Sequence, residues 1–198
     1  MISLARKPEI SHIEYHLAST YFLNAIEYLK KCSKNACGII SYVETSDIEI
    51  NVLVVRDQDS GFYPYKNDLQ IPPPCIVWAA NRSLTIFGKR ENSRGLVDAD
   101  YSPEIGLLHE LGHAKQFIED RGYRLGRKIG QKQPWFPLNA SSLNDQQNAD
   151  VEADNLRRHE HPVCQDLGLV IRNNYQNFRG TSDFNLRTAG ALYLGNRA

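Results

Sequence analysis

At 198 residues the chain is long enough for one compact domain, and a division into two would leave both halves small. Its 23 basic and 23 acidic residues give a formal net charge of zero, so no global field favours nucleic acid or an anionic membrane as a partner. No apolar stretch approaches the roughly 20 residues that span a bilayer. We therefore expect no membrane span and no nucleic-acid partner.

Two further features bear on where the protein acts. Residues 1–19 mix charged and apolar positions and lack the apolar core of a Sec signal peptide, which leaves secretion by another route open. The 4 cysteines are too few for a dense disulfide framework in a chain of this size, so we expect reduced thiols.

The first part of the chain predicts one helix and then strands. Apolar side chains recur at helical spacing over Ile13–Lys31. Ile, Val and Tyr are then concentrated in Gly38–Val43 and Ile48–Val55, with a turn-prone Glu-Thr-Ser-Asp run between them. We expect these two segments to be strands.

Loops and a hairpin are predicted next. An Asp-Ser-Gly run and three consecutive prolines favour a loop over Asp57–Pro74. Cys75–Ala79 and Ser83–Phe87 predict the two strands of a hairpin, which turns at residues 80–82. A second loop is expected over Gly88–Tyr101.

Two helices are predicted in the second part of the chain. Ser102–Asp120 begins with serine as an N-cap and has proline at the first helical position. The other helix is Asn148–Glu160, which we expect Pro162 to end. The polar segment Arg124–Gln147 between them predicts a long loop.

The predicted helix Ser102–Asp120 carries the motif His-Glu-Leu-Gly-His at positions 109–113. His109 and His113 are four residues apart and share one helical face, where both imidazoles can ligate one metal ion at about 2.0–2.1 Å. Glu110 lies about 100° around the helix from His109, which suits a general base acting on a metal-bound water. The motif therefore predicts a catalytic zinc site.

The neighbours of the motif favour this interpretation over a chance match. Apolar residues surround it, so the helix is expected to be buried. Buried histidines and a buried glutamate are costly unless polar or charged partners compensate them. Gly112 allows another segment to approach the helix closely. A purely structural zinc site has no need of Glu110 and is usually closed by four ligands, often cysteines.

A catalytic zinc normally takes three protein ligands and leaves one position for water. The long metzincin motif would need Gly at 116 and His at 119, where this chain has Gln116 and Glu119, so that class is excluded. A carboxylate from the next predicted helix is expected instead, as in the gluzincin arrangement. Glu152 and Glu160 are best placed to face the core. We favour Glu152, with Glu160 and Asp154 as the alternatives.

His159 and His161 follow in the same predicted helix. They lie beside Arg157 and Arg158 at its end, where positive charge complements the helix dipole. We expect both histidines at the surface rather than at the metal.

Taken together, these residues resemble a known family. Leu107–Ala114 with the zinc motif, Glu152–Pro162 and Leu167–Tyr175 are similar to the NleD-like peptidases, short-spacer zincins found among bacterial type III secretion effectors and as toxin domains. The resemblance covers about residues 105–175. Its Glu…Glu-x-Pro…Leu-Gly…Arg-x-x-Tyr pattern is more specific than the zinc motif alone.

We expect one compact α+β domain over residues 1–198. An N-terminal helix and a small twisted sheet would occupy residues 1–104, and the zinc-binding helices and the C-terminal part would occupy 105–198. The resemblance implies that this fold is zincin-like, with the sheet packed on the motif helix and on a second helix that bears a ligand.

The resemblance also implies residue roles and a biological setting. Arg172 and Tyr175 match its Arg-x-x-Tyr, which suggests a place at the active site, where either could donate a hydrogen bond to the developing oxyanion. The alternative role for Arg172 and Tyr175 is a purely structural hydrogen bond. An effector or toxin of this kind, which we expect to be a monomer, would be secreted by a non-Sec route into the host cytosol and cut a host signalling protein there.

Two other functions stay open. The enzyme could act on a bacterial substrate in the bacterial cytoplasm, or the protein could be a non-catalytic binding module that a metal stabilises. For an endopeptidase of a host protein, we expect an extended substrate to add as a further strand onto Ser83–Phe87.

Overall fold

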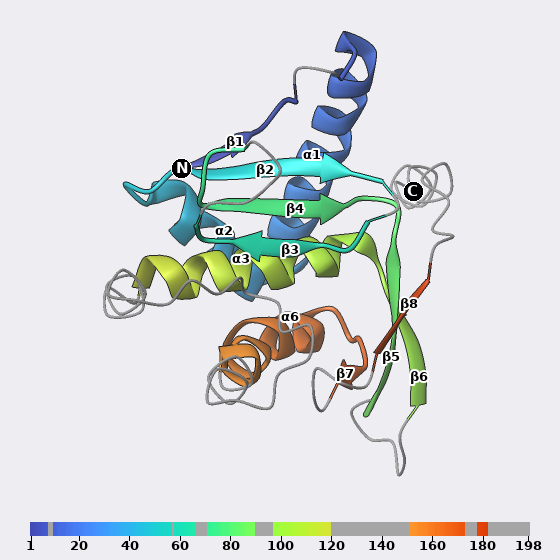
Figure 1. Ribbon diagram of the computed structural model, residues 1–198. Coiled ribbons are helices and arrows are strands. Elements are labelled where there is room, and N and C mark those ends of the chain that lie inside the picture. Colours follow the sequence, from blue (N-terminus) through green and yellow to red (C-terminus); the bar gives the residue numbers. More distant parts are fainter. Residues whose placement is uncertain are drawn as a thin grey trace, which may run out of the picture.

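Two small β-sheets and a set of helices make up the described part of the protein (Figure 1). The computed structural model describes residues 1–7, 10–56, 58–65, 71–89, 97–119, 151–172 and 178–181. The helices are α1 (His12–Cys32), α2 (Lys34–Thr45), α3 (Pro103–Glu119), the π-helical segment η2 (Leu156–Glu160) and α6 (His161–Asp166). The strands are β1 (Ile2–Leu4), β2 (Ile50–Val55), β3 (Gly61–Tyr63), β4 (Cys75–Ala79), β5 (Ser83–Lys89), β6 (Val97–Tyr101), β7 (Ile171–Arg172) and β8 (Phe178–Thr181). This mixture is compatible with the expected α+β class, and none of the described helices has the length and apolarity needed to cross a membrane.

The first sheet has the strand order β1-β2-β4-β3. β1 and β4 run parallel to β2 on either side of it, and β3 runs antiparallel to β4. Helices α1 and α3 pack against one face of this sheet (Figure 1). The main core contains buried apolar residues of α1, α2, α3, β2 and β4. A small apolar cluster of Leu53, Ile71 and Cys75 lies apart from this core. Every residue of β4 is buried.

The predicted hairpin of Cys75–Ala79 and Ser83–Phe87 is wrong, although both of its strands exist. β5 belongs to a second sheet, where it pairs with β6 on one side and with β7 and β8 on the other. β4 already has β2 and β3 as its neighbours, so it offers no edge to β5. The two flanked edges of β5 also contradict the expectation that a substrate strand adds to Ser83–Phe87.

The predicted strand Gly38–Val43 is wrong as well, because these residues lie within helix α2. The side chain of Ser33 caps this helix by accepting a hydrogen bond from the Ala36 amide at 3.0 Å. The buried residues of α2 recur at helical spacing; they are Ala36, Ile39, Ile40 and Val43. This periodicity outweighs the strand propensity of Ile, Val and Tyr.

Of the other predictions for the first part of the chain, some are confirmed and some are wrong. The helix Ile13–Lys31 is confirmed as α1, and the strand Ile48–Val55 is confirmed as β2. The loops predicted over Asp57–Pro74 and Gly88–Tyr101 miss strands β3 and β6, and β1 was not expected. β3 has only 3 residues, too few to show the period of two that marks a strand. β6 does show this period, because apolar residues alternate with Asp in it. The predicted loop Arg124–Gln147 lies outside the described residues.

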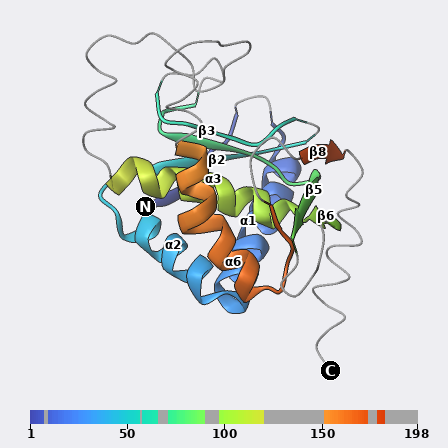
Figure 2. The ribbon, with the colours of Figure 1, turned by 90° about the horizontal axis from the view of Figure 1, so that it is seen from below.

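Helix α3 confirms the predicted helix that carries the motif, and it lies between the first sheet and the helical segment 151–166 (Figure 2). Its start is tied to β4, because Trp78 donates a hydrogen bond from Nε1 to the backbone oxygen of Pro103 at 2.8 Å. Its last turn is tied to β3, because Phe117 packs edge to face on Phe62. The motif between these two anchors is therefore held against the sheet.

Residues 151–166 form one continuous helical segment, so Pro162 does not end a helix as predicted. Pro162 is the second residue of α6 and lacks the amide hydrogen that a residue inside a helix would donate. The turn before it, Leu156–Glu160, is π-helical and wider than an α-helical turn.

Helix α3 and segment 151–166 approach each other closely at Gly112. A Cβ atom at this position would lie 2.1 Å from Asn155 Oδ1 and 3.0 Å from His159 Cβ. The close approach expected at this glycine is confirmed. Gly106, six residues earlier on α3, has room for a Cβ, because the nearest atom would be Ser60 Oγ at 3.9 Å.

We therefore expect Gly112→Ala and Gly106→Ala to change stability in opposite directions. The first substitution forces two helices apart and should destabilise the fold by about 1–3 kcal/mol. The second removes a flexible residue from a helix and should stabilise it by about 0.5–1 kcal/mol. Urea denaturation of both variants measures the difference. A Gly112→Ala variant as stable as wild type would contradict the packing described here.

Candidate metal centre

Helix α3 buries the three polar residues of its motif. His109, Glu110 and His113 are only 6%, 7% and 5% exposed. The two imidazole rings meet edge to face with their centroids 4.7 Å apart. Asn155 of the facing segment donates from Nδ2 to the backbone oxygen of His109 at 2.9 Å. The two histidines therefore share one face of α3, as their spacing predicts.

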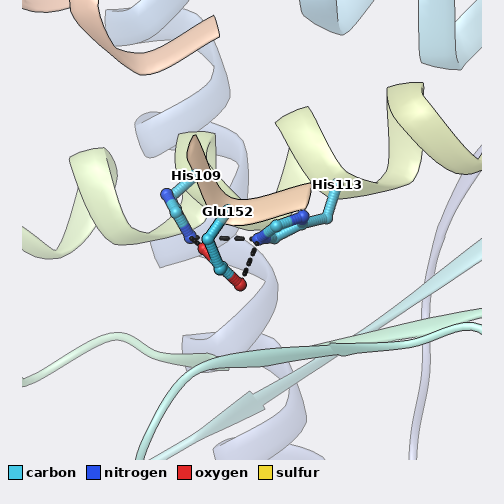
Figure 3. Close-up of side chains that lie close together, drawn as sticks. All are labelled: His109, His113 and Glu152. Carbon is cyan, nitrogen blue, oxygen red and sulfur yellow. Dashed lines mark hydrogen bonds and ion pairs between the residues drawn. The ribbon is translucent and has the colours of Figure 1, made fainter. Parts of the chain in front are cut away.

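Glu152 reaches the two histidines from the facing helix (Figure 3). Its Oε1 lies 3.1 Å from His113 Nε2, and its Oε2 lies 3.3 Å from His109 Nε2. The two Nε2 atoms are 3.1 Å apart. The structure thus brings the favoured third residue, Glu152, to the histidine pair, and one ligand atom from each of the three lies within 4.8 Å of the others.

These spacings fit a metal ion. Ligand atoms at about 2.0–2.1 Å from a tetrahedral ion stand roughly 3.3 Å from one another. In the described part of the chain, Glu152 Oε2 is buried and accepts no well-aligned hydrogen bond, and such an atom is costly unless a charge compensates it. Two imidazoles and a carboxylate suit several divalent metals, so these residues form a candidate metal site and do not select zinc.

His109 meets a buried ion pair at its other ring nitrogen. Glu160 Oε2 lies 2.9 Å from His109 Nδ1. Arg172 donates to both oxygens of the same carboxylate, from Nε at 2.7 Å and from Nη2 at 2.5 Å. A carboxylate behind a ligating histidine holds the ring and its tautomer in place. Glu160 therefore lies where it can support His109 rather than ligate the metal.

Asp154, the other carboxylate considered as a ligand, points to the surface side of the same helix. It accepts a hydrogen bond from Gln116 Nε2 at 2.8 Å and pairs with Arg157 and Arg158. Like Glu160, it lies outside the group formed by Glu152 and the two histidines.

His159 and His161 also stay outside this group, but the expected surface position of His159 is wrong. His159 is buried against Gly112. Burial, reinforced by Lys115 and Arg158, lowers its pKa to about 4, so the ring is neutral at pH 7. His161 is half-buried, with Nε2 2.9 Å from the backbone oxygen of Arg172.

The ionisable groups of this cluster influence one another strongly. Burial lowers the pKa of His109, but the carboxylates of Glu152 and Glu160, one beside each ring nitrogen, outweigh it and raise this pKa to about 10. Burial raises the pKa of Glu160, but the charges of Arg172 and His109 outweigh it and lower this pKa to about 2. The pKa of Glu152 is lowered in the same way, by His113 and His109 against burial. Without a metal, a proton on His109 thus faces two ionised carboxylates.

Glu110 and His109 lie at the wall of a pocket of about 310 Å³. The rest of the wall combines apolar side chains with hydroxyl and charged groups: Gln58, Asp59, Ser60, Ala79, Arg82, Ser83, Leu84, Tyr101, Ser102, Ile105, Gly106, Glu160 and Arg172. Burial raises the pKa of Glu110 against the opposing effect of His109 and His113. A buried carboxylate whose pKa is raised, at the wall of a pocket, is suited to take up a proton.

Two expected site residues and two unexpected ones complete the description. Arg172 is buried against Glu160 and His109, whereas Tyr175 lies outside the described residues. Sequence reasoning missed Asn155 and Gln116 as partners of the histidines. Helical spacing could have found both, because each follows a motif or ligand candidate by three residues on the same helix face.

We expect Glu152→Ala to weaken zinc binding far more than Glu160→Gln. The first removes a candidate ligand, whereas the second removes only the partner of His109, for which a loss of about 10–100-fold is typical. Glu119→Ala, at the exposed end of α3, is the control and should bind zinc as wild type does. Competition with a chromophoric chelator measures all four affinities. Full affinity in Glu152→Ala would exclude this residue as a ligand.

Zinc binding should also release about one proton per ion near neutral pH. The pKa of about 10 means that His109 is protonated in the metal-free protein at pH 7, and this proton has to leave before Nε2 can ligate. Zinc affinity should therefore fall as the pH is lowered, by roughly tenfold per pH unit for one displaced proton. Titration calorimetry in buffers of different ionisation enthalpy counts the protons, and a count of zero would contradict this charge state.

No family model matches the chain, and neither a curated protein nor a solved structure matches it. The resemblance to the NleD-like peptidases therefore stays a prediction. The functional argument depends on the geometry of the site.

Proposed function

We propose that the protein is a zinc-dependent endopeptidase with a zincin-like arrangement of sheet and helices. The observation that carries the proposal is the convergence of His109, His113 and Glu152 on one point, beside the buried Glu110. Three protein ligands leave one position of a tetrahedral ion open, which is typical of catalytic zinc sites. A motif helix packed between a sheet and a second helix that bears a ligand supports the zincin-like part of the proposal.

Zinc held at this point would lower the pKa of a bound water to about 7 and polarise a substrate carbonyl. Glu110 accepts a proton on its carboxylate during the attack on the carbonyl and returns it to the leaving amine. Its burial, which raises its pKa, favours holding that proton between the two steps. Glu160 and Arg172 keep the ring of His109 in its orientation throughout.

The pocket beside Glu110 supports a peptide as the substrate. A volume of about 310 Å³ suits part of a peptide rather than a large organic cofactor. Its apolar residues, among them Leu84 and Ile105, can cover a side chain, while the hydroxyls of Ser60 and Ser83 can bond to a peptide backbone. A substrate bound there lies directly against the carboxylate that moves the proton.

The biological part of the proposal depends on the resemblance alone. An NleD-like effector or toxin would reach the host cytosol by a non-Sec route and cut a host signalling protein as a monomer. Cleavage of a bacterial protein in the bacterial cytoplasm is the alternative. A non-catalytic binding module accounts less well for Glu110, because such a module has no use for a buried carboxylate at the wall of a pocket.

We expect Glu110→Gln to abolish proteolysis while zinc binding is retained. The amide has nearly the same shape but cannot take up the proton, and such a loss costs about 10²–10⁴-fold in rate. Glu119→Gln is the matched control on the same helix, where the exposed pairs with Lys115 and Arg158 contribute little.

Eukaryotic and bacterial lysates serve as the two substrate pools for wild type and both variants. Cleavage only of eukaryotic proteins would support the effector role, and cleavage only of bacterial ones would support the alternative. Absence of cleavage in both pools, or equal cleavage by Glu110→Gln, would contradict the endopeptidase proposal.

A further inference from the structure

Gln116 connects the two helices that form the candidate metal centre. It follows His113 by three residues on α3, and its side chain is buried. Its Oε1 lies 2.9 Å from His113 Nδ1. Its Nε2 lies 3.1 Å from the backbone oxygen of Val151 and 2.8 Å from Asp154 Oδ2, both on the segment that carries Glu152.

The direction of these hydrogen bonds follows from the partner atoms on segment 151–155. The backbone oxygen of Val151 can only accept a hydrogen bond, and Asp154 Oδ2 lies beside the same nitrogen of Gln116. Both oxygens must therefore face the NH₂ group of Gln116. Its carbonyl oxygen then faces His113, so that Nδ1 of this ring carries a hydrogen and donates it.

This choice of tautomer decides what His113 can offer to a metal. A neutral imidazole with its hydrogen on Nδ1 has its lone pair on Nε2. Nε2 is the atom that lies 3.1 Å from Glu152 Oε1 and 3.1 Å from His109 Nε2. The backbone of the segment that supplies Glu152 thus directs, through Gln116, the lone pair of His113 toward the same point.

We propose that Gln116 is a positioning residue that couples the docking of segment 151–155 to the orientation of His113. Docking brings Glu152 to the site and, through the buried amide of Gln116, also fixes the orientation and tautomer of His113. The two histidines are then supported by different chemistry, since His109 is held by the ion pair of Glu160 and Arg172. The inference relies on the proposed metal centre, but the hydrogen bond between Gln116 and His113 does not itself require a metal.

Two substitutions of Gln116 separate this role from that of a space-filling residue. Gln116→Leu removes all three hydrogen bonds and puts an apolar side chain of similar size in their place. Gln116→Glu keeps an acceptor for His113 Nδ1 and loses the donor to Val151. Lys115→Gln, on the neighbouring position of α3, is the control, because the ammonium contacts only Glu119 and the ring of Tyr42 among the interactions described.

Zinc affinity should fall by about 10–100-fold in Gln116→Leu, fall less in Gln116→Glu, and stay unchanged in Lys115→Gln. A space-filling role predicts the reverse order of the first two, because leucine packs well and a buried glutamate is costly. In nuclear magnetic resonance spectra, a slowly exchanging Nδ1–H of His113 should be present in wild type and Gln116→Glu, with or without zinc, and absent from Gln116→Leu.

Wild-type zinc affinity in Gln116→Leu, or an Nε2–H tautomer of His113 in metal-free wild type, would overturn the inference. If Gln116→Leu does not fold, the comparison of Gln116→Glu with Lys115→Gln and the wild-type spectrum still decide it. A wild-type protein that binds no zinc but shows the protected Nδ1–H would overturn the proposed function and leave the hydrogen bond to Gln116 confirmed.

Discussion

The candidate site depends on one close contact between two helices, at Gly112 of α3. Because this residue has no side chain, Asn155 enters the space beside it and donates to the backbone oxygen of His109. The contact determines how deeply segment 151–166 lies against α3. A methyl group there would move the segment outward, and Glu152 and Glu160 would lose their distances to His109. Metal–ligand distances vary by only about 0.2 Å, so Gly112 is part of the geometry that the candidate ligands need.

Charge balance provides a second constraint. Glu110, Glu152 and Glu160 lie buried or nearly buried around two imidazoles, and Arg172 is the guanidinium that faces them within the described part of the chain. Carboxylates in such surroundings need compensating positive charge. A proton on His109 supplies part of it in the metal-free protein. A divalent cation would supply more at the point where the Glu152 carboxylate meets the two Nε2 atoms, which is an argument for a metal that does not depend on any motif.

The position of the candidate site could be predicted more completely than the sheets around it. His109, Glu110 and His113 are neighbours in sequence, so helical geometry alone brings them together, and the period of the next helix favours Glu152. The segment Gly38–Val43 misled because strand propensity and helical period disagree there, and packing against α1 and α3 decided the outcome. No local pattern could predict that β5 leaves β4, because that choice depends on which edges of β4 are already occupied.

Glu160 illustrates a limit of a different kind, since sequence reasoning treats it as a competitor of Glu152. In a regular α-helix, eight residues rotate about 80° beyond two full turns, so these two carboxylates would not face the same ring. The π-helical turn Leu156–Glu160 has hydrogen bonds that span five residues, so it rotates less per residue and offsets that rotation. Glu160 thereby returns to the side of Glu152, and each carboxylate meets a different nitrogen of His109. No sequence pattern predicts this one widened turn. It gives the two carboxylates complementary positions: Glu152 lies where it can bind a metal, and Glu160 lies where it can orient His109.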